Sequence, residues 1–303
     1  MKSTISEYMQ FVSQMYKSSS HLFFGETLLR SESGVQQGDP LGPLLFCLVI
    51  KPMTELISSR LNLWYLDDGA LGGDPEDVRD DLVTIMKESE KLGLSLNLSK
   101  CEILTTAGTG INAAQCLLDV SDNLKTPSRS EYVLLGSPLT DEAISDVVEE
   151  KKVIVSRLVD RLSILGSHQA LFLLKNCLSL PKLLYIMRTE HVYQFEDLLR
   201  SFDEIIRTSL SKVTNIAMTE PVWRQASLPV RHGGLGIRRT EQLALPAYLA
   251  SAHFVLPLIK EIYPTFSEDE TTTDALFAWS TYMGPEIEIP AVRSVQRIWD
   301  EPI

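Results

Sequence analysis

The sequence contains few metal-binding or disulfide-forming side chains. Among its 303 residues are four cysteines and five histidines. Cys47, Cys101, Cys116 and Cys177 stand far apart, with no C-x-x-C pair and no paired histidines beside them. That spacing argues against a disulfide framework and against a zinc site. We therefore expect free thiols in a reducing compartment.

Long apolar runs are also lacking. No uninterrupted run reaches the roughly 18 residues that a membrane span requires, and the longest apolar stretch, 41–50, is interrupted by Pro43. Residues 1–17 carry Glu7 and several polar side chains where a signal peptide needs an apolar segment. We expect an intracellular protein of the cytoplasm or nucleus that is neither secreted nor bound to a membrane.

Positive charge is in deficit, with 28 basic against 40 acidic residues and a net charge of −12. Proteins that bind a phosphate backbone usually present a basic face. The acidic balance therefore counts against strong nucleic-acid binding by the isolated chain, although it does not fix how charge is distributed. The hydrophobic content of 44% and charged content of 22% are typical of a globular protein with a packed core.

Apolar periodicity divides the chain into a mixed first part and a helical second part. In the first part the pattern predicts helices over 4–17, 41–60 and 75–92, a hairpin of strands 21–24 and 27–30, strands 61–65, 70–71, 96–104 and 132–135, and a loop over 105–130 with a short strand at 116–120. Later, it predicts helices within 141–218 and over 240–262. We accordingly predict two domains, 1–140 and 141–303.

The strongest chemical signal is Tyr65-Leu66-Asp67-Asp68-Gly69, which lies between two predicted strands. Adjacent acids at a hairpin tip suit hard Mg²⁺ ions, which prefer oxygen ligands. Two such ions can hold the attacking and leaving oxygens of a phosphoryl transfer. Asp-Asp-Gly is also a common turn sequence, so the pair alone does not decide between a turn and a metal site.

The surrounding segments favour a metal site over a simple turn. Upstream lies Gly-Val-Gln-Gln-Gly-Asp-Pro-Leu-Gly-Pro-Leu-Leu-Phe at 34–46, and downstream lie Gly-Leu-Ser-Leu-Asn-Leu-Ser-Lys-Cys-Glu at 93–102 and Tyr-Val-Leu-Leu-Gly at 132–136. In order and spacing these resemble the second to fifth palm motifs of reverse transcriptases and are similar to those of non-LTR retrotransposons. The Gly- and Pro-containing stretch 223–237 resembles sequences that often follow in such elements.

This resemblance implies an α/β (α+β) fold. Its first part would be a truncated polymerase palm, with a mainly antiparallel sheet and helices on one face. An all-helical, thumb-like region would follow. Loss of the opening palm strand would expose a sheet edge, which could bind a protein partner.

The resemblance also implies roles for single residues. Asp67 would be the direct Mg²⁺ ligand, and Asp68 a second ligand or electrostatic support. Gln37 and Gly38, followed by Asp39 and Pro40, would lie beside the template base and the incoming dNTP. The partners would be an RNA or DNA template with its primer.

Some of these positions have ordinary structural explanations as well. Asp39 would also suit the cap of a helix that begins at Pro40, and this explanation can hold together with the nucleotide-binding one. Lys100 would assist the leaving pyrophosphate or would be a solvated loop lysine. Leu134, Leu135 and Gly136 would grip the primer end or would form a plain core strand and turn; these alternatives remain open in the sequence.

One element of the family pattern is missing. In reverse transcriptases the palm opens with a strand that carries the first metal-binding aspartate, whereas this chain starts with Met1 downstream of that point. No other acid is expected to replace it: no apolar strand leads into Asp269 or Asp274, and Asp203 sits in a helical pattern. We expect an RNA-directed DNA polymerase domain that is inactive as this chain. The alternatives are a non-catalytic retroelement relic or co-opted binding module, and a helical scaffold in which Asp67 is merely a turn residue.

Overall fold

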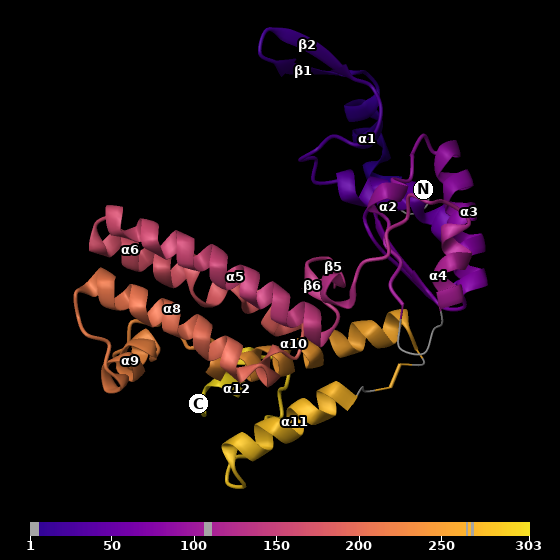
Figure 1. The fold of residues 1–303 in the computed structure, drawn as a ribbon. Helices are drawn as coiled ribbons and strands as arrows, with labels where there is room; N and C mark the ends of the chain where they lie inside the picture. The colour runs from indigo at the N-terminus through magenta and orange to yellow at the C-terminus, as the bar shows by residue number, and fades with distance from the viewer. Residues whose placement is uncertain (1–5, 106–110, 265, 268–269) are drawn as a thin grey trace. The chain divides into compact units, whose positions relative to one another are not determined.

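The chain folds into two compact units, Met1–Thr126 and Pro127–Ile303. The computed structural model describes residues 6–105, 111–264, 266–267 and 270–303. Figure 1 shows both units.

The first unit combines small antiparallel hairpins with helices (Figure 1). Strands β1 and β2 pair with each other, and β3 pairs with β4. Its elements are η1 (Ser6–Tyr8), α1 (Met9–Tyr16), β1 (Ser20–Phe24), β2 (Thr27–Ser31), α2 (Gly42–Thr54), β3 (Leu61–Tyr65), β4 (Asp68–Gly72), α3 (Pro75–Lys91), η2 (Leu98–Lys100) and α4 (Ile111–Leu118).

A small apolar core holds this unit together. Ile50 and Met53 of α2 and Ile85 of α3 are buried, and Trp64 of β3 and Leu71 of β4 pack against them. Side chains alternate along β3, so Trp64 faces the helices while its sequence neighbours are exposed. The hairpin is thus covered on one face only.

Helix α3 follows the predicted boundaries because its end signals are strong. The Asp74 carboxylate accepts a hydrogen bond from the backbone N–H of Glu76 (3.0 Å), and Pro75 occupies the first turn. At the other end, Gly93 takes a positive φ of 74° after the last helical turn.

Asp81 of α3 binds the connection between α2 and β3. Its carboxylate accepts hydrogen bonds from the backbone N–H groups of Ser58 (3.0 Å) and Ser59 (2.6 Å) and from both hydroxyls. Burial raises the pKa of Asp81, but these donors outweigh it and hold the pKa below its usual value. Because of these hydrogen bonds, the residues around Ser58 do not continue helix α2.

Three of the predictions for elements of this unit are wrong. Helix α2 ends at Thr54, because the Thr54 carbonyl accepts from the Asn62 side chain (2.9 Å) and the following residues are bound to Asp81. The strand expected at 96–104 is a 3₁₀ turn (η2) and a single parallel bridge between Glu102 and Lys125. The segment expected to form a strand at 116–120 lies in and just after α4, where Cys116 contacts α3 at Arg79.

The second unit is almost entirely helical. Apart from the hairpin of β5 with β6, no strand occurs among its described residues, as the periodicity predicted for the region after 140. Its elements are η3 (Arg129–Glu131), β5 (Val133–Leu134), β6 (Ser137–Pro138), α5 (Asp141–Arg161), η4 (Leu162–Ile164), α6 (Ser167–Leu173), the π-helix η5 (Leu174–Leu178), η6 (Leu180–Lys182), α7 (Leu184–Thr189), η7 (Val192–Gln194), α8 (Glu196–Thr214), α9 (Glu220–Ser227), η8 (Val230–His232), α10 (Thr240–Ile262), α11 (Glu270–Met283) and α12 (Gln296–Asp300).

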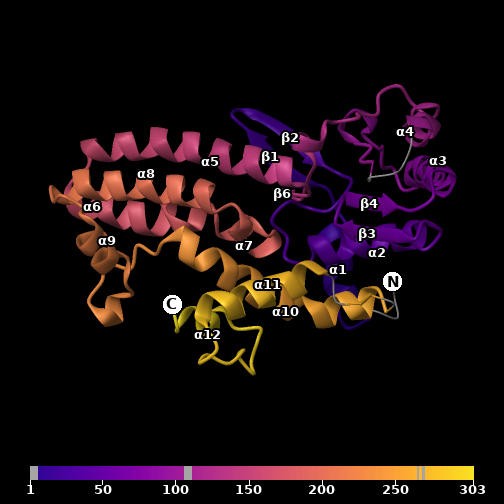
Figure 2. The same ribbon diagram turned by 60° about the horizontal axis from the view of Figure 1, so that its bottom comes forward.

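Helix α10 connects the two apolar clusters of this unit. Helices α5, α6 and α8 run side by side, as Figures 1 and 2 show, and bury one cluster that includes Phe202 and the first half of α10. The later residues Tyr248 and Leu249 belong to the second cluster with Trp279 and Trp299, whose rings meet edge to face at 5.0 Å. The mixed α/β class and its helical second part are therefore confirmed.

Two helical stretches of this unit, Ser167–Thr189 and Thr240–Ile262, are 23 residues long and apolar enough to cross a membrane by length and composition. Of the most apolar window in each, 39% is buried inside the unit. Core helices of soluble proteins meet the same criterion, so this feature assigns no membrane.

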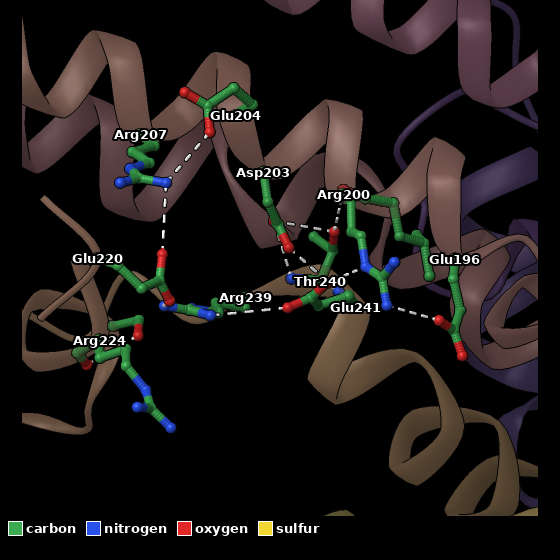
Figure 3. A network of polar contacts seen from close by, with 12 residues as sticks. Glu196, Arg200, Asp203, Glu204, Arg207, Glu220, Arg224, Arg239, Thr240 and Glu241 are labelled. Carbon is green, nitrogen blue, oxygen red and sulfur yellow. Dashed lines mark hydrogen bonds and ion pairs between the residues drawn. The ribbon is translucent and has the colours of Figure 1, made fainter. Parts of the chain in front are cut away.

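A buried carboxylate fixes the start of α10. Asp203 of α8 accepts hydrogen bonds from the backbone N–H of Thr240 (2.9 Å), from its hydroxyl (2.9 Å) and from the N–H of Glu241 (3.2 Å). Figure 3 shows this carboxylate directed at the first turn of α10. A side chain from one helix thus supplies the N-terminal cap of another.

Ion pairs continue the network around this cap (Figure 3). Arg239 lies 2.9 Å from Glu220 and stacks over the ring of Trp223 at 5.5 Å. Arg207 contacts the same Glu220 at 3.4 Å. The connection between α8, α9 and α10 is therefore held by charge as well as by apolar packing.

The Asp203 cap predicts a pH-dependent stability. Burial raises the pKa of Asp203 from 3.8 to about 6, although the hydrogen bonds from Thr240 and Glu241 lower it. Because the folded-state pKa is the higher one, this group's stabilisation is complete below pH 3.8 and is lost as the pH rises through about 6. A shift of about two units corresponds to roughly 3 kcal/mol.

The measurement is urea unfolding between pH 4 and 7, followed by tryptophan fluorescence, for the unaltered chain and for Asp203→Asn. Asparagine does not titrate, so the difference between the two curves isolates this carboxyl group. We expect the free energy of unfolding of the unaltered chain to fall, relative to the variant, as the pH rises. If the free energy of unfolding of the unaltered chain, relative to that of the variant, stayed constant or rose with pH, the assignment would be contradicted.

Candidate nucleotide and metal site

The two adjacent acids lie at the tip of the β3–β4 hairpin. Tyr65 and Asp68 form the last residue pair of the ladder, and Leu66 and Asp67 make the turn between them. Leu66 has a left-handed φ of 57°. Both carboxylates are exposed to solvent. The predicted placement at a hairpin tip is confirmed.

A cavity of about 670 Å³ opens beside this tip. Asp67 lines it together with Gln37, Gly38 and Asp39 of the segment that precedes α2. The floor is apolar and is built from the core of the first unit, including Ile50 and other residues of α2, α3 and β3. The structure thus brings together two of the segments that the sequence marked as functional.

The segment before α2 forms a tight turn rather than a helix cap. Gly38 has a φ of 90°, which favours glycine, and the Asp39 N–H donates to the Gln36 carbonyl at 3.1 Å. Helix α2 begins at Gly42 with Leu41 as its N-cap, so the alternative of Asp39 as cap and Pro40 as first residue is wrong. Asp39 instead accepts from the N–H of Leu41 at 2.9 Å, because the chain turns once more before the helix.

Trp64 shapes the cavity from below the tip. Its indole N–H donates to the side-chain oxygen of Asn62 (2.8 Å), whose amide donates to the carbonyl of Thr54 at the end of α2. The ring lies over Gly69, where a Cβ atom would come within 2.8 Å of Trp64 Cζ3. The motifs did not indicate a role for Trp64. The alternation of side chains along β3, which places Trp64 on the buried face, was the signal that could have found it.

The other expected site residues lie outside the cavity. Pro40, Asp68 and Lys100 do not line it, and Lys100 is an exposed residue of η2. Asp203 and Asp274 belong to the second unit, in α8 and α11, while Asp269 lies outside the described residues.

The expected primer-grip residues form the hairpin of the second unit. Leu134 ends β5, and Leu135 and Gly136 make its turn with positive φ values of 51° and 80°. The Tyr185 hydroxyl of α7 donates to the Leu135 carbonyl at 2.8 Å. Beside it, Ser137 donates to Glu190 at 2.9 Å. This turn is therefore fixed by α7, and its role at a primer remains a prediction.

The carboxylates suit a hard cation but supply few ligands. Asp67 and Asp68 offer exposed oxygen donors, which match the preference of Mg²⁺. Among the described residues, no group of three or more His, Cys, Asp or Glu side chains could hold a metal ion. The residues fit a weak site for one ion, with Asp67 facing the cavity.

A double-acid hairpin tip beside a Gln-Gly turn is the arrangement that the palm motifs predicted for the first unit. A family model described as reverse transcriptase (RNA-dependent DNA polymerase) matches residues 2–139. This part of the chain is a reverse transcriptase domain, which confirms the family inferred from the motifs.

A retrotransposon protein matches over a longer segment. The retrotransposable element SLACS 132 kDa protein of Trypanosoma brucei gambiense is 26% identical over 254 residues, which cover 82% of this chain. The matched segment is 20% of that protein, so the chain corresponds to about a fifth of the relative's length. No solved structure matches.

The contact between Gly69 and Trp64 predicts a steric effect on the site. Gly69→Ala should displace the indole and lower the local stability of the β3–β4 hairpin by about 1–3 kcal/mol, as overpacking of a closed contact does. Amide hydrogen exchange of the paired residues in β3 measures this local stability.

The matched control places the same alanine beside a smaller neighbour. In a Trp64→Leu background the clash is removed, so the additional cost of Gly69→Ala should shrink. An equal cost in both backgrounds would mean that backbone preference, rather than the indole, requires glycine at this position.

Proposed function

We propose that this chain is the palm and thumb-like part of an RNA-directed DNA polymerase of a retrotransposable element. The observation that carries the proposal is the cavity in which Asp67 faces the Gln37–Gly38 turn. A nucleotidyl transfer site needs a carboxylate for a metal ion next to a close backbone surface for the nucleotide. Similarity to the SLACS protein supports a retroelement origin.

Within this proposal each residue has a specific task. Asp67 holds Mg²⁺ at the edge of the cavity, and Asp68 supports it from the solvent side of the tip. Gln37 and Gly38 bind the template base and the incoming dNTP. Bound Mg²⁺ would neutralise the triphosphate and activate the attacking oxygen.

The second unit has its own proposed part in binding the template–primer. Its hairpin turn at Leu135 and Gly136 contacts the primer end, and its long helices form the thumb-like part. Lys100 of the first unit serves the leaving pyrophosphate. The large acidic excess makes the affinity for nucleic acid depend on local rather than net charge.

We further propose that the 303-residue chain by itself does not turn over. A two-metal site needs several carboxylates around one point, and among the described residues no group of three or more acidic, His or Cys side chains is placed to hold a metal ion. The same observation supports the second candidate function, a non-catalytic retroelement relic or co-opted binding module.

Metal binding at the tip is testable directly. Titration with Mn²⁺ should broaden the amide NMR signals of Leu66–Gly69, because a paramagnetic ion relaxes nearby nuclei. Asp67→Asn should abolish this broadening, while Asp122→Asn, which alters an exposed turn carboxylate elsewhere in the same unit, should leave it unchanged. Equal broadening in Asp67→Asn would place the ion elsewhere.

Primer extension tests turnover. The purified chain, with a labelled primer annealed to RNA and with Mg²⁺ or Mn²⁺, should give no measurable extension. Asp67→Ala should change the free energy of unfolding by less than about 0.5 kcal/mol, because an exposed turn carboxylate contributes little packing. Extension by the unaltered chain that the variant abolishes would refute inactivity; extension that persists in the variant would indicate a contaminating polymerase.

A further inference from the structure

The turn that lines the cavity is held by residues outside every recognised motif. Tyr16, the last residue of α1, donates its hydroxyl to Asp39 Oδ2 at 2.5 Å. The same hydroxyl accepts from the backbone N–H of Gln36 at 3.3 Å. The Gln36 side-chain amide donates to the hydroxyl of Ser20 at the start of β1. Helix α1 and strand β1, which both precede the turn, therefore bind its first half.

Asp39 is bound at both carboxylate oxygens. Oδ2 accepts from Tyr16, and Oδ1 accepts from the N–H of Leu41 at 2.9 Å. The hydrogen bond from Tyr16 lowers the pKa of Asp39, and the same bond raises the pKa of Tyr16. Both directions agree with a phenol that donates to a carboxylate. Asp39 thus joins the end of α1 to the entry of α2.

Gln37 and Gly38 lie between the two braced residues. Gln36 is fixed by Tyr16 and Ser20, and Asp39 by Tyr16 and Leu41. The backbone bond from Asp39 N–H to the Gln36 carbonyl closes the turn at 3.1 Å. No Cβ anchors Gly38, and an added one would meet no heavy atom within 4 Å. The position of this apex beside the cavity therefore depends on the braces at its two ends.

We propose that Tyr16 is a positioning residue for nucleotide binding, which acts through Asp39 to hold Gln37 and Gly38 opposite Asp67. Asp39 then braces the turn and does not itself contact the nucleotide. The inference rests on the proposed function of the cavity as the dNTP site. It adds a residue that no palm motif contains and changes the role expected for Asp39.

The experiment measures the affinity of the full chain for a Mg²⁺–dNTP complex by NMR. The reporter is the indole N–H signal of Trp64, which lines the cavity. Tyr16→Phe removes only the hydroxyl and should weaken binding on the order of tenfold, which is the lower end of the effect expected when a hydrogen bond to a charged group is lost. Asp39→Ala should weaken binding similarly, and the double variant should be no weaker than either single variant.

Two controls separate positioning from loss of structure. Tyr8→Phe makes the same change at an exposed tyrosine just before α1 and should leave affinity unchanged. Amide hydrogen exchange should accelerate at Gln37 and Gly38 in Tyr16→Phe but stay the same at Ile50 within α2. A purely structural role would instead lower the melting temperature without changing the affinity of the folded protein.

The outcomes are distinguishable. Failure of the unaltered chain to bind Mg²⁺–dNTP would refute the proposed function, and the role of Tyr16 with it. Normal binding by the unaltered chain and by Tyr16→Phe would refute the positioning role alone. Losses that multiply in the double variant would show that Asp39 contacts the nucleotide directly.

Discussion

The apolar contact between the β3–β4 hairpin and helices α2 and α3 is the constraint on which the site depends. A two-stranded hairpin is at best marginally stable in water, so its form requires burial of one face. Ile50, Met53 and Ile85 supply that surface, and Trp64 packs on it. These same side chains make the floor of the cavity beside Asp67. The core of the first unit and the cavity therefore share these side chains. A substitution that changes the packing of the core also changes the shape of the cavity.

Carboxylates in this acidic chain serve repeatedly as acceptors for backbone N–H groups of other elements. Asp39 binds Leu41, Asp81 binds the Ser58–Ser59 connection, and Asp203 binds the first turn of α10. In each case the carboxylate satisfies donors that a turn or helix start leaves without partners. Part of the excess negative charge is thus internal structure, which is why the net charge of −12 is a poor measure of the surface that a nucleic acid would meet.

The environments of these carboxylates also separate structural from chemical roles. Asp203 is buried and bound on several sides, and its pKa rises to about 6 because desolvation outweighs its hydrogen bonds. Asp67, in contrast, is exposed on a turn at the rim of a cavity. An exposed carboxylate can bind a cation without first giving up protein hydrogen bonds. Asp39 lies between these cases: it lines the cavity, yet both of its oxygens bind the protein itself.

Local patterns predicted the elements whose signals lie within a few residues. Helix α3 has its own cap, proline and terminal glycine, and both predicted hairpins of the first unit formed. The site residues Gln37, Gly38 and Asp67 were recognised because an ordered set of motifs marks them. The errors fell where partners distant in sequence decide. Helix α2 stops at Thr54, where Asn62 binds its last carbonyl and Asp81 binds the connection that follows, and the expected strand at 96–104 forms only a single bridge to Lys125.

The sequence by itself determined the family, the mixed-to-helical order of the chain and the acids at the hairpin tip, because these depend on short-range spacing and motif order. Only the tertiary structure decided what Asp39 binds, where Trp64 lies and which side chains share the cavity. Tyr16 stands 23 residues from Asp39, and no local pattern relates them. Hydrogen bonds of that kind form only after the chain has folded back on itself, so their partners are set by geometry and not by residue type.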